Sequence, residues 1–250
     1  MANKVILITG ALTGIGRAVA LAFAREANAQ IVVSGRREQD GKQLAREIRA
    51  LGAEAEFIYA DVRNEDDVRN LIDKAVERFG RLDVAVNNAG TEGSPGPIVN
   101  QTEDSYRSTF DTNVLGTILS LKHELRVMST QGRGSIITIS STFGHRPFAG
   151  ASIYVASKHA IEGLTLSVSL EAAAFDVRVN VVAPGPIQTG MLDRFVGGSE
   201  ENKAGLASTV PLKRVGTVEE VASTVLFLAS DGASFITGSV LSVDGGVSSA

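Results

Sequence analysis

The 250-residue sequence contains no cysteine and only three histidines. The absence of cysteine excludes disulfide bonds, thiolate metal sites and a cysteine nucleophile. The three histidines are scattered along the chain, so the sequence predicts no metal site built from histidine; they are His123, His145 and His159.

The sequence also has little net charge and no long apolar run. Its formal net charge is −4 and no stretch is rich in lysine or arginine, so nothing indicates a nucleic-acid partner. The first apolar run, residues 5–8, ends at Thr9-Gly10 and is too short for a signal peptide. No stretch approaches the roughly 18 apolar residues of a membrane span. We therefore expect a soluble, cytoplasmic protein without a membrane partner.

Short β-rich apolar runs alternate with longer helical patterns, and hydrophobic residues form 44% of the chain, enough for a packed core. The predicted strands are 4–9, 29–35, 55–61, 82–88, 134–140, 177–184 and 238–245. The predicted helices are 15–27, 38–51, 65–79, 103–130, 153–174 and 218–230. This alternation predicts an α/β fold in which helices cover both faces of a parallel sheet. No linker or repeat is visible, which favours a single domain over residues 1–250.

The stretch TGALTGIG, residues 9–16, joins the first predicted strand to the first predicted helix. Gly10 permits the tight turn, Gly14 lets the backbone approach a bound pyrophosphate, and Gly16 lets helix and strand pack closely. The phosphate would meet the free N–H groups and the positive end of the helix dipole. Three glycines in a turn can also be purely structural, and the spacing differs from the commoner G-x-G-x-x-G, but the strand–turn–helix context favours a dinucleotide site.

Polar residues also follow the third and fourth predicted strands. Asp61-Val62 and Asn87-Asn88-Ala89-Gly90 stand at carboxyl ends of strands, where ligands bind in a doubly wound sheet. The alternative explanations are a helix N-cap at Asp61 or Asn64, and a plain turn at the asparagine pair.

Tyr154 and Lys158 stand four residues apart at the start of a predicted helix and therefore share one of its faces. A nearby ammonium group stabilises a phenolate, so we expect Lys158 to lower the pKa of Tyr154 and to fit it for proton transfer. Ser141 ends the strand that feeds this helix, and its hydroxyl can donate to a carbonyl oxygen. Asn113 lies inside the predicted helix 103–130, where asparagine is only a middling helix former, so it is either a functional, water-binding residue or a solvent-facing one.

These motifs together closely resemble the classical short-chain dehydrogenase/reductase family, over essentially the whole chain. The resemblance rests on Thr9-Gly10, Gly14-Ile15-Gly16, Asp61-Val62, Asn87-Asn88-Ala89-Gly90, Asn113, Ser141, Tyr154, Lys158 and Pro184-Gly185. It implies a single Rossmann-type domain with a doubly wound, seven-stranded parallel sheet. It also implies a nicotinamide cofactor, hydride exchange between a carbonyl and an alcohol, and a homotetramer.

The resemblance also implies roles for individual residues. Tyr154 exchanges a proton with the substrate oxygen, Ser141 hydrogen-bonds the same oxygen, and Lys158 holds the nicotinamide ribose. Asn113 positions a water that links Lys158 to bulk solvent. Asp61 and Val62 contact the adenine, Asn87 the ribose side, and Ile187 and Thr189 the carboxamide. The expected cofactor contacts are Gly10, Thr13, Gly14, Ile15, Gly16, Arg36, Arg37, Asp61, Val62, Asn87, Ala89, Gly90, Tyr154, Lys158, Pro184, Gly185, Ile187 and Thr189.

The end of the second predicted strand bears on the choice of cofactor. An acidic residue there would bind the ribose hydroxyls of NAD, but this sequence has Gly35, followed by Arg36 and Arg37. Arginine suits a 2′-phosphate because its charge is permanent and its donors form a planar fork. Both arginines can instead be solvated residues at a helix start, and Thr13 stands where NADP-preferring relatives often carry a basic residue. We predict a preference for NADP over NAD.

The substrate pocket is expected between three segments, 91–97, 142–148 and the long loop-like connection 184–208, which is typical of a lid. Its expected lining is apolar and favours a hydrophobic ketone or ketoester; it comprises Phe143, Phe148, Met191, Leu192, Phe195 and Leu206. His145 is a possible substrate contact, whereas His159 is expected to be structural or exposed. The alternatives are a 3-oxoacyl-carrier-protein reductase, with Arg126, Arg133 and Arg194 available for the carrier, and a non-catalytic cofactor-sensing protein.

Overall fold

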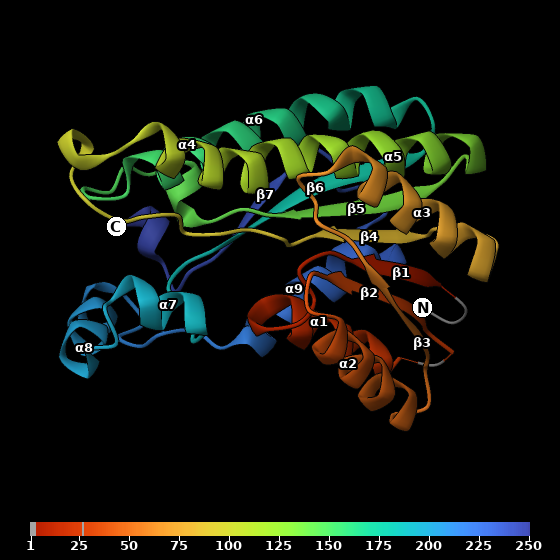
Figure 1. Ribbon diagram of the computed structural model, residues 1–250, viewed down its shortest axis with the longest axis horizontal. Coiled ribbons are helices and arrows are strands. Elements are labelled where there is room, and N and C mark those ends of the chain that lie inside the picture. The colour runs from red at the N-terminus through yellow and green to blue at the C-terminus, as the bar shows by residue number, and fades with distance from the viewer. Residues whose placement is uncertain (1–3, 27) are drawn as a thin grey trace.

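A parallel sheet lies at the centre of the molecule, with helices on both of its faces (Figure 1). The computed structural model describes residues 4–26 and 28–250, so residues 1–3 and the predicted helix end at residue 27 lie outside the described part. The strands are β1 Val5–Ile8, β2 Gln30–Gly35, β3 Glu54–Tyr59, β4 Val84–Asn87, β5 Gly134–Ile139, β6 Val177–Pro184 and β7 Val240–Val243. Within the described residues they form one seven-stranded sheet of order β3-β2-β1-β4-β5-β6-β7, and every pair is parallel. The predicted fold class and strand number are confirmed.

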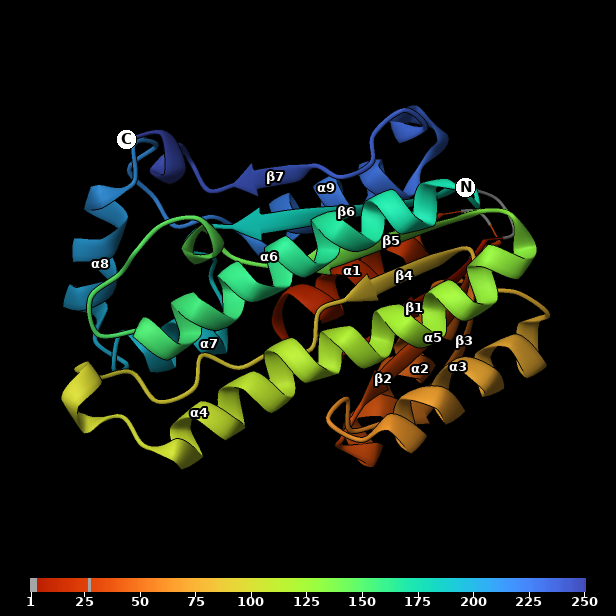
Figure 2. The same ribbon diagram turned by 90° about the horizontal axis from the view of Figure 1, so that it is seen from above.

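Helices cover the two faces of the sheet in two groups (Figures 1 and 2). On one face lie α1 Gly14–Ala24, α2 Glu38–Ala50 and α9 Val218–Ala229. On the other lie α3 Glu65–Phe79, α4 Glu103–Phe110, α5 Gly116–Gln131 and α6 Ser152–Ala173. Alternate side chains of one strand enter opposite cores: Ile6 and Ile8 pack with α1 and α9, and Leu7 packs on the opposite side. This two-sided burial explains why the strands read as continuous apolar runs in the sequence.

The start of α3 decides between the two N-caps that the sequence left open. The Asn64 side chain accepts hydrogen bonds from the backbone N–H groups of Asp66 and Asp67, at 2.9 and 3.2 Å. Asp61 is therefore free of this capping role. The helix ends at Gly80, whose φ of 79° is the left-handed conformation that favours glycine at this position.

The structure differs from the predicted elements in two segments. The helix predicted over 103–130 is interrupted by a π-helical turn, Asp111–Leu115, between α4 and α5. The segment 184–208, predicted to be loop-like, contains α7 Gly190–Phe195 and the start of α8 Glu200–Thr209. Thr189 and Ser199 cap these helices by accepting from Leu192 N and Asn202 N. No residue of α8 is buried, so this helix has no apolar stripe by which its sequence pattern could reveal it.

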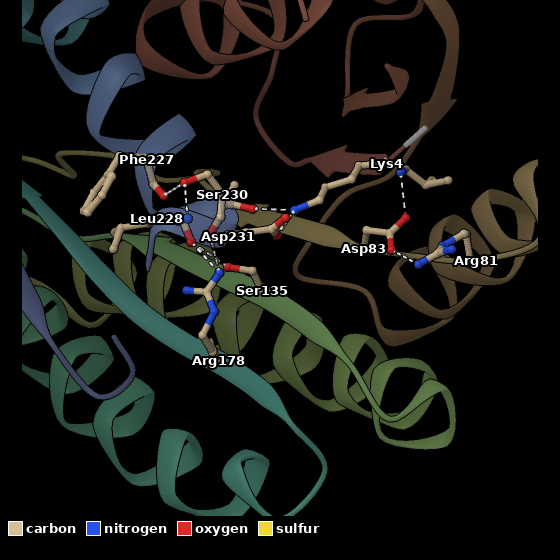
Figure 3. A network of polar contacts seen from close by, with 12 residues as sticks. Lys4, Arg81, Asp83, Ser135, Arg178, Phe227, Leu228, Ser230 and Asp231 are labelled. Carbon is tan, nitrogen blue, oxygen red and sulfur yellow. Dashed lines mark hydrogen bonds and ion pairs between the residues drawn. The ribbon is translucent and has the colours of Figure 1, made fainter. Parts of the chain in front are cut away.

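The edge of the sheet where the strands begin is fixed by a polar network around the end of α9 (Figure 3). Lys4 Nζ donates to Ala229 O and to Asp231 Oδ1, both at 3.1 Å. Ser135 Oγ and Arg178 Nη2 donate to Leu228 O at 3.1 and 2.8 Å. The cations stabilise the negative end of the helix dipole and satisfy its last carbonyls.

Two further observations concern the described residues as a whole. None of their helices combines the length and the apolar character needed to cross a membrane. Their histidine, aspartate and glutamate side chains form no group of three that could hold a metal ion.

Candidate active site

A cavity of about 450 Å³ lies at the edge of the sheet where the strands end. Figure 2 shows α7 and α8 beside this edge, beyond the arrowheads of β6 and β7. Ser141, Tyr154 and Lys158 line the cavity together. The six predicted apolar lining residues are all in its wall: Phe143, Phe148, Met191, Leu192, Phe195 and Leu206. The aromatic rings of Phe143, Phe148 and Phe195 pack on one another, with centroids 4.7 to 6.2 Å apart.

The helix α6 presents Tyr154 and Lys158 one turn apart, and both side chains are buried. The Tyr154 and Ser141 side chains share one end of the cavity wall, where the Ser141 hydroxyl favours the ionised form of Tyr154 and so lowers its pKa. Lys158 Nζ donates to Ile139 O at 3.0 Å and lies 5.7 Å from the centroid of the Tyr154 ring. Two hydroxyls and one amine therefore lie at one end of a mostly apolar cavity, an arrangement suited to binding and protonating a carbonyl oxygen.

The predicted lowering of the Tyr154 pKa was wrong for the protein without ligand. Burial raises the pKa of Tyr154 to about 12; the Ser141 hydrogen bond lowers it, and the negative charge of Glu92 raises it further. Burial likewise lowers the pKa of Lys158 to about 8, against the opposing effect of Glu162. The helical spacing brings the pair together, but desolvation disfavours the charged form of each group and is the largest cause of both shifts.

Asn113 lies in the π-helical turn and is 1% exposed, so it is not the solvent-facing residue of the alternative explanation. Its amide nitrogen donates to Thr91 O and to Ser157 Oγ, at 2.9 and 3.0 Å. Its amide oxygen accepts from Thr91 N at 2.9 Å. The side chain therefore fastens the loop after β4 to α6, beside the cavity. Such π-turns are frequent at functional sites.

The glycine loop forms a cradle that larger residues would fill. Gly10 and Gly14 have φ values of 61° and 54°, in the left-handed region. A Cβ on Gly16 would lie 2.4 Å from Asn88 Nδ2 and 2.6 Å from Gly10 O. Thr13 caps α1 without a side-chain hydrogen bond, so no side chain of the N-cap covers the first N–H groups of this helix. This cradle and helix end fit a pyrophosphate, and therefore a dinucleotide.

The asparagine pair divides its roles differently from the prediction. Asn88 lines the cavity, and its Nδ2 donates to Thr9 O and Gly10 O at 3.1 and 2.9 Å, which fixes the glycine loop. Asn87, expected on the ribose side, is instead buried away from the cavity wall, and its Nδ2 donates to Glu124 Oε2 at 2.9 Å. The sequence pattern could not show that Glu124, in the middle of α5, is its partner.

The remaining predicted cofactor residues lie along the same edge. Ile15, Gly90, Pro184, Gly185, Ile187 and Thr189 all line the cavity. Thr189 accepts from Leu192 N and donates to Ile187 O, both at 3.2 Å, so its hydroxyl also starts α7. Ala89 N donates a hydrogen bond to Thr9 Oγ1 at 3.2 Å. The strand ends and the glycine loop are thereby tied together.

Charged residues surround the end of β2. Arg63 forms a two-pronged contact with Asp61, at 2.5 and 2.9 Å, and this hydrogen bonding lowers the pKa of Asp61. Arg36 Nη1 lies 4.0 Å from Asp61 Oδ2, whereas Arg37 pairs with Asp40 on its own helix. Val62, the neighbour of Asp61, is buried.

The two histidines in and just before α6 do not line the cavity. His145 Nδ1 lies 3.2 Å from Glu162 Oε2, in an ion-pair position beside α6. His159 is exposed, as predicted, and its Nδ1 is 2.9 Å from Val155 O. The possible substrate contact of His145 is therefore not found.

Comparisons with known proteins agree on one family. The sequence profile described as "Enoyl-(Acyl carrier protein) reductase" matches residues 10–248. The "short chain dehydrogenase/reductase astE" of Aspergillus oryzae is 41% identical, over 98% of this chain and 95% of its own length. The crystal structure of levodione reductase superposes with a TM-score of 0.97 at 32% identity and covers 100% of this chain and 99% of its own. A structure of ElxO with NADP bound gives a TM-score of 0.91 at 36% identity, with 99% of each chain covered.

Proposed function

The chain belongs to the short-chain dehydrogenase/reductase family and is an oxidoreductase, and we propose that it exchanges a hydride between NADP and an apolar ketone or ketoester, or the matching secondary alcohol. The observation that carries this proposal is that Ser141, Tyr154 and Lys158 line one end of a mostly apolar cavity together. The nicotinamide cofactor supplies or accepts the hydride when it is bound.

The residues of the chain handle the proton and the oxygen. In reduction, Tyr154 donates its proton to the carbonyl oxygen. Tyr154 carries this proton at pH 7 because burial raises its pKa to about 12. Ser141 donates to the same oxygen as negative charge develops there. Lys158 binds the ribose and, as a cation, stabilises Tyr154 once the proton has left. Asn113 belongs to this set because it fastens the loop beside the site, and we propose that it also positions a water next to Lys158.

Three features of the chain favour NADP over NAD. Gly35 stands where an acidic residue would bind the ribose hydroxyls of NAD, and a Cβ there would lie 2.8 Å from Leu12 Cγ and Cδ1. Arg36 is exposed beside Asp61, a proposed adenine contact, and leaves its donors largely free for a phosphate. Arg37 adds positive charge nearby, although Asp40 partly neutralises it.

The carrier-linked alternative finds less support in the arrangement of arginines. Arg194 lies on α7 at the cavity, but Arg126 pairs with Asp73 between α5 and α3, and Arg133 lies where β5 begins, at the opposite edge of the sheet. These three cations do not surround one entrance. The non-catalytic alternative would need no acid–base pair, whereas this chain keeps Ser141, Tyr154 and Lys158 together.

We further propose a homotetramer in the cytoplasm. Exposed apolar side chains on α4, the π-turn, α5 and α6 support an interface across these helices; they include Tyr106, Leu115, Ile118 and Leu170. Light scattering that gives a monomer at micromolar concentration would contradict the tetramer.

The test of the function is turnover with a panel of apolar ketones, ketoesters and one carrier-bound 3-oxoacyl thioester, with NADPH and NADH in turn. We expect free ketones or ketoesters to react with the higher kcat/KM, and NADPH to exceed NADH. A clear preference for the carrier-bound thioester would favour the alternative enzyme, and cofactor binding without turnover of any compound would favour the sensing protein.

A further inference from the structure

An ion pair that the reaction above does not use joins two walls of the cavity. Glu92 stands on the loop after β4, lines the cavity and is 8% exposed. Arg194 stands on α7, between the wall residues Leu192 and Phe195. The Arg194 guanidinium donates two hydrogen bonds to the Glu92 carboxylate, Nε to Oε1 at 2.5 Å and Nη2 to Oε2 at 3.2 Å.

The two partners differ strongly in exposure. The Arg194 side chain is 65% exposed, while the Glu92 side chain is buried in the wall. A buried carboxylate without a partner is costly, so Glu92 gives α7 a preferred position in which Arg194 covers it. Phe195 follows Arg194 directly, and its ring packs 5.7 Å from that of Phe148 across the cavity wall. The ion pair and this aromatic contact therefore hold the same short helix in place.

The same carboxylate acts on the catalytic tyrosine. The cavity wall that holds Tyr154 also contains Lys158 from α6, Ser141 and Arg146 from the segment between β5 and α6, and Glu92 from the loop after β4. Glu162, which has His145 beside it, raises the pKa of Lys158. Among these, Glu92 lines the same cavity as Tyr154, its negative charge raises the pKa of Tyr154, and Arg194 is the cation in contact with it.

We propose that the Glu92–Arg194 pair is a positioning device for the reaction proposed above: Arg194 fastens α7 over the substrate and partly neutralises a carboxylate that opposes negative charge at Tyr154. The inference rests on the proposed function for its second half. The first half, the fastening of α7, stands on the contacts alone.

The experiment compares Glu92→Gln, Arg194→Met and the double variant with a matched control, Arg107→Met. Arg107 pairs with Glu103 on the surface of α4, at 2.8 Å and away from the cavity wall. Alcohol oxidation is followed against pH at saturating cofactor, because Tyr154 must then accept a proton and the rising limb of kcat follows its pKa. Hydrogen exchange of α7 is measured separately, without substrate.

Each single variant is expected to raise KM for the alcohol about tenfold, which is the effect of losing a charged hydrogen bond that has one exposed partner. The double variant should raise KM no further, because both substitutions remove the same contact. The rising limb should move to lower pH in Glu92→Gln, which removes the negative charge. It should move to higher pH in Arg194→Met, which leaves that charge without its cation. If the two substitutions only disturbed the structure, the rising limbs of both variants would shift in the same direction. The control variant Arg107→Met should change neither KM nor the position of the rising limb.

The exchange of α7 is expected to accelerate in both single variants and to stay at the wild-type rate in the control. Unchanged exchange together with unchanged KM would overturn the fastening role, and limbs that move together would overturn the electrostatic role. If the wild-type protein oxidised no alcohol and reduced no carbonyl, the proposed function would fail, while the exchange result would still decide the fastening of α7.

Discussion

Glu124 is a completely buried carboxyl group whose titration should control stability. It lies in the middle of α5, and its Oε2 accepts from Asn87 Nδ2 at 2.9 Å. Its other oxygen, Oε1, and the amide oxygen of Asn87 have no hydrogen-bond partner in the described protein. A proton on Glu124 Oε1 would let the carboxyl group donate to Asn87 Oδ1, so that acid and amide satisfy each other. Burial raises the pKa of Glu124 to about 7, which favours this neutral form, while the Asn87 bond lowers it.

The sign and size of the effect follow from this shift. The folded-state pKa of about 7 lies above the ordinary value of 4.5, so between these pH values the folded protein holds a proton that the unfolded chain has lost. The stabilisation is fully present below pH 4.5 and is lost as the pH rises through 7. At 1.36 kcal/mol per pH unit, the loss amounts to roughly 3 kcal/mol in the free energy of unfolding.

The assay is chemical denaturation of the wild-type protein and of Glu124→Gln between pH 5 and 9, at one protein concentration. A glutamine amide can make the same two bonds to Asn87 and does not titrate. We expect similar stabilities at pH 5, and a variant more stable than wild type by roughly 3 kcal/mol at pH 9. A difference that stays constant over this pH range would refute a buried, titrating Glu124.

Three further predictions concern the catalytic and cofactor residues. Tyr154→Phe keeps the ring but removes the proton, so turnover should fall about 10²- to 10⁴-fold, while cofactor binding measured by fluorescence persists; residual activity above about a tenth of wild type would contradict the assigned role. Lys158→Met should reduce both turnover and cofactor affinity, and unchanged affinity in a binding titration would exclude the ribose contact. Arg36→Ala should lower kcat/KM with NADPH about ten- to a hundredfold and leave kcat/KM with NADH nearly unchanged. Arg37→Ala is the control, and its effect should be smaller because Arg37 is already paired with Asp40. A wild-type kcat/KM with NADH equal to or above that with NADPH would overturn the NADP preference.

The sheet and most of the helices could be predicted because their signals are local. Strands that are buried on both faces appear as continuous apolar runs, and β6 was predicted with its observed limits. The amphipathic face of α3 appears as a helical spacing, and its residues Val68, Leu71 and Ile72 are fully buried. The apolar cavity lining was also predictable, since the three segments that form it follow the ends of strands.

What the sequence could not reveal depends on contacts between distant residues. Nothing near Asn87 indicates that its amide faces Glu124, 37 residues away. Glu92 and Arg194, 102 residues apart, look like ordinary surface charges until the fold places them together. The π-turn at Asn113 is equally hidden, because a single widened turn leaves the helical pattern of the flanking residues almost unchanged.

Helix α6 shows why the spacing of two residues and their energetics must be considered separately. The interval between Tyr154 and Lys158 fixes their common helix face, and this much the sequence predicts. Their charges are set by burial, which favours the neutral form of both and holds the pKa of Tyr154 near 12 and that of Lys158 near 8. A neutral tyrosine already carries the proton that carbonyl reduction needs, so the buried site is prepared for that direction without a lowered pKa. Oxidation requires the phenolate, and for it the charges near Tyr154 matter most. The cation of Lys158 favours the phenolate, and the carboxylate of Glu92 opposes it to an extent that Arg194 reduces.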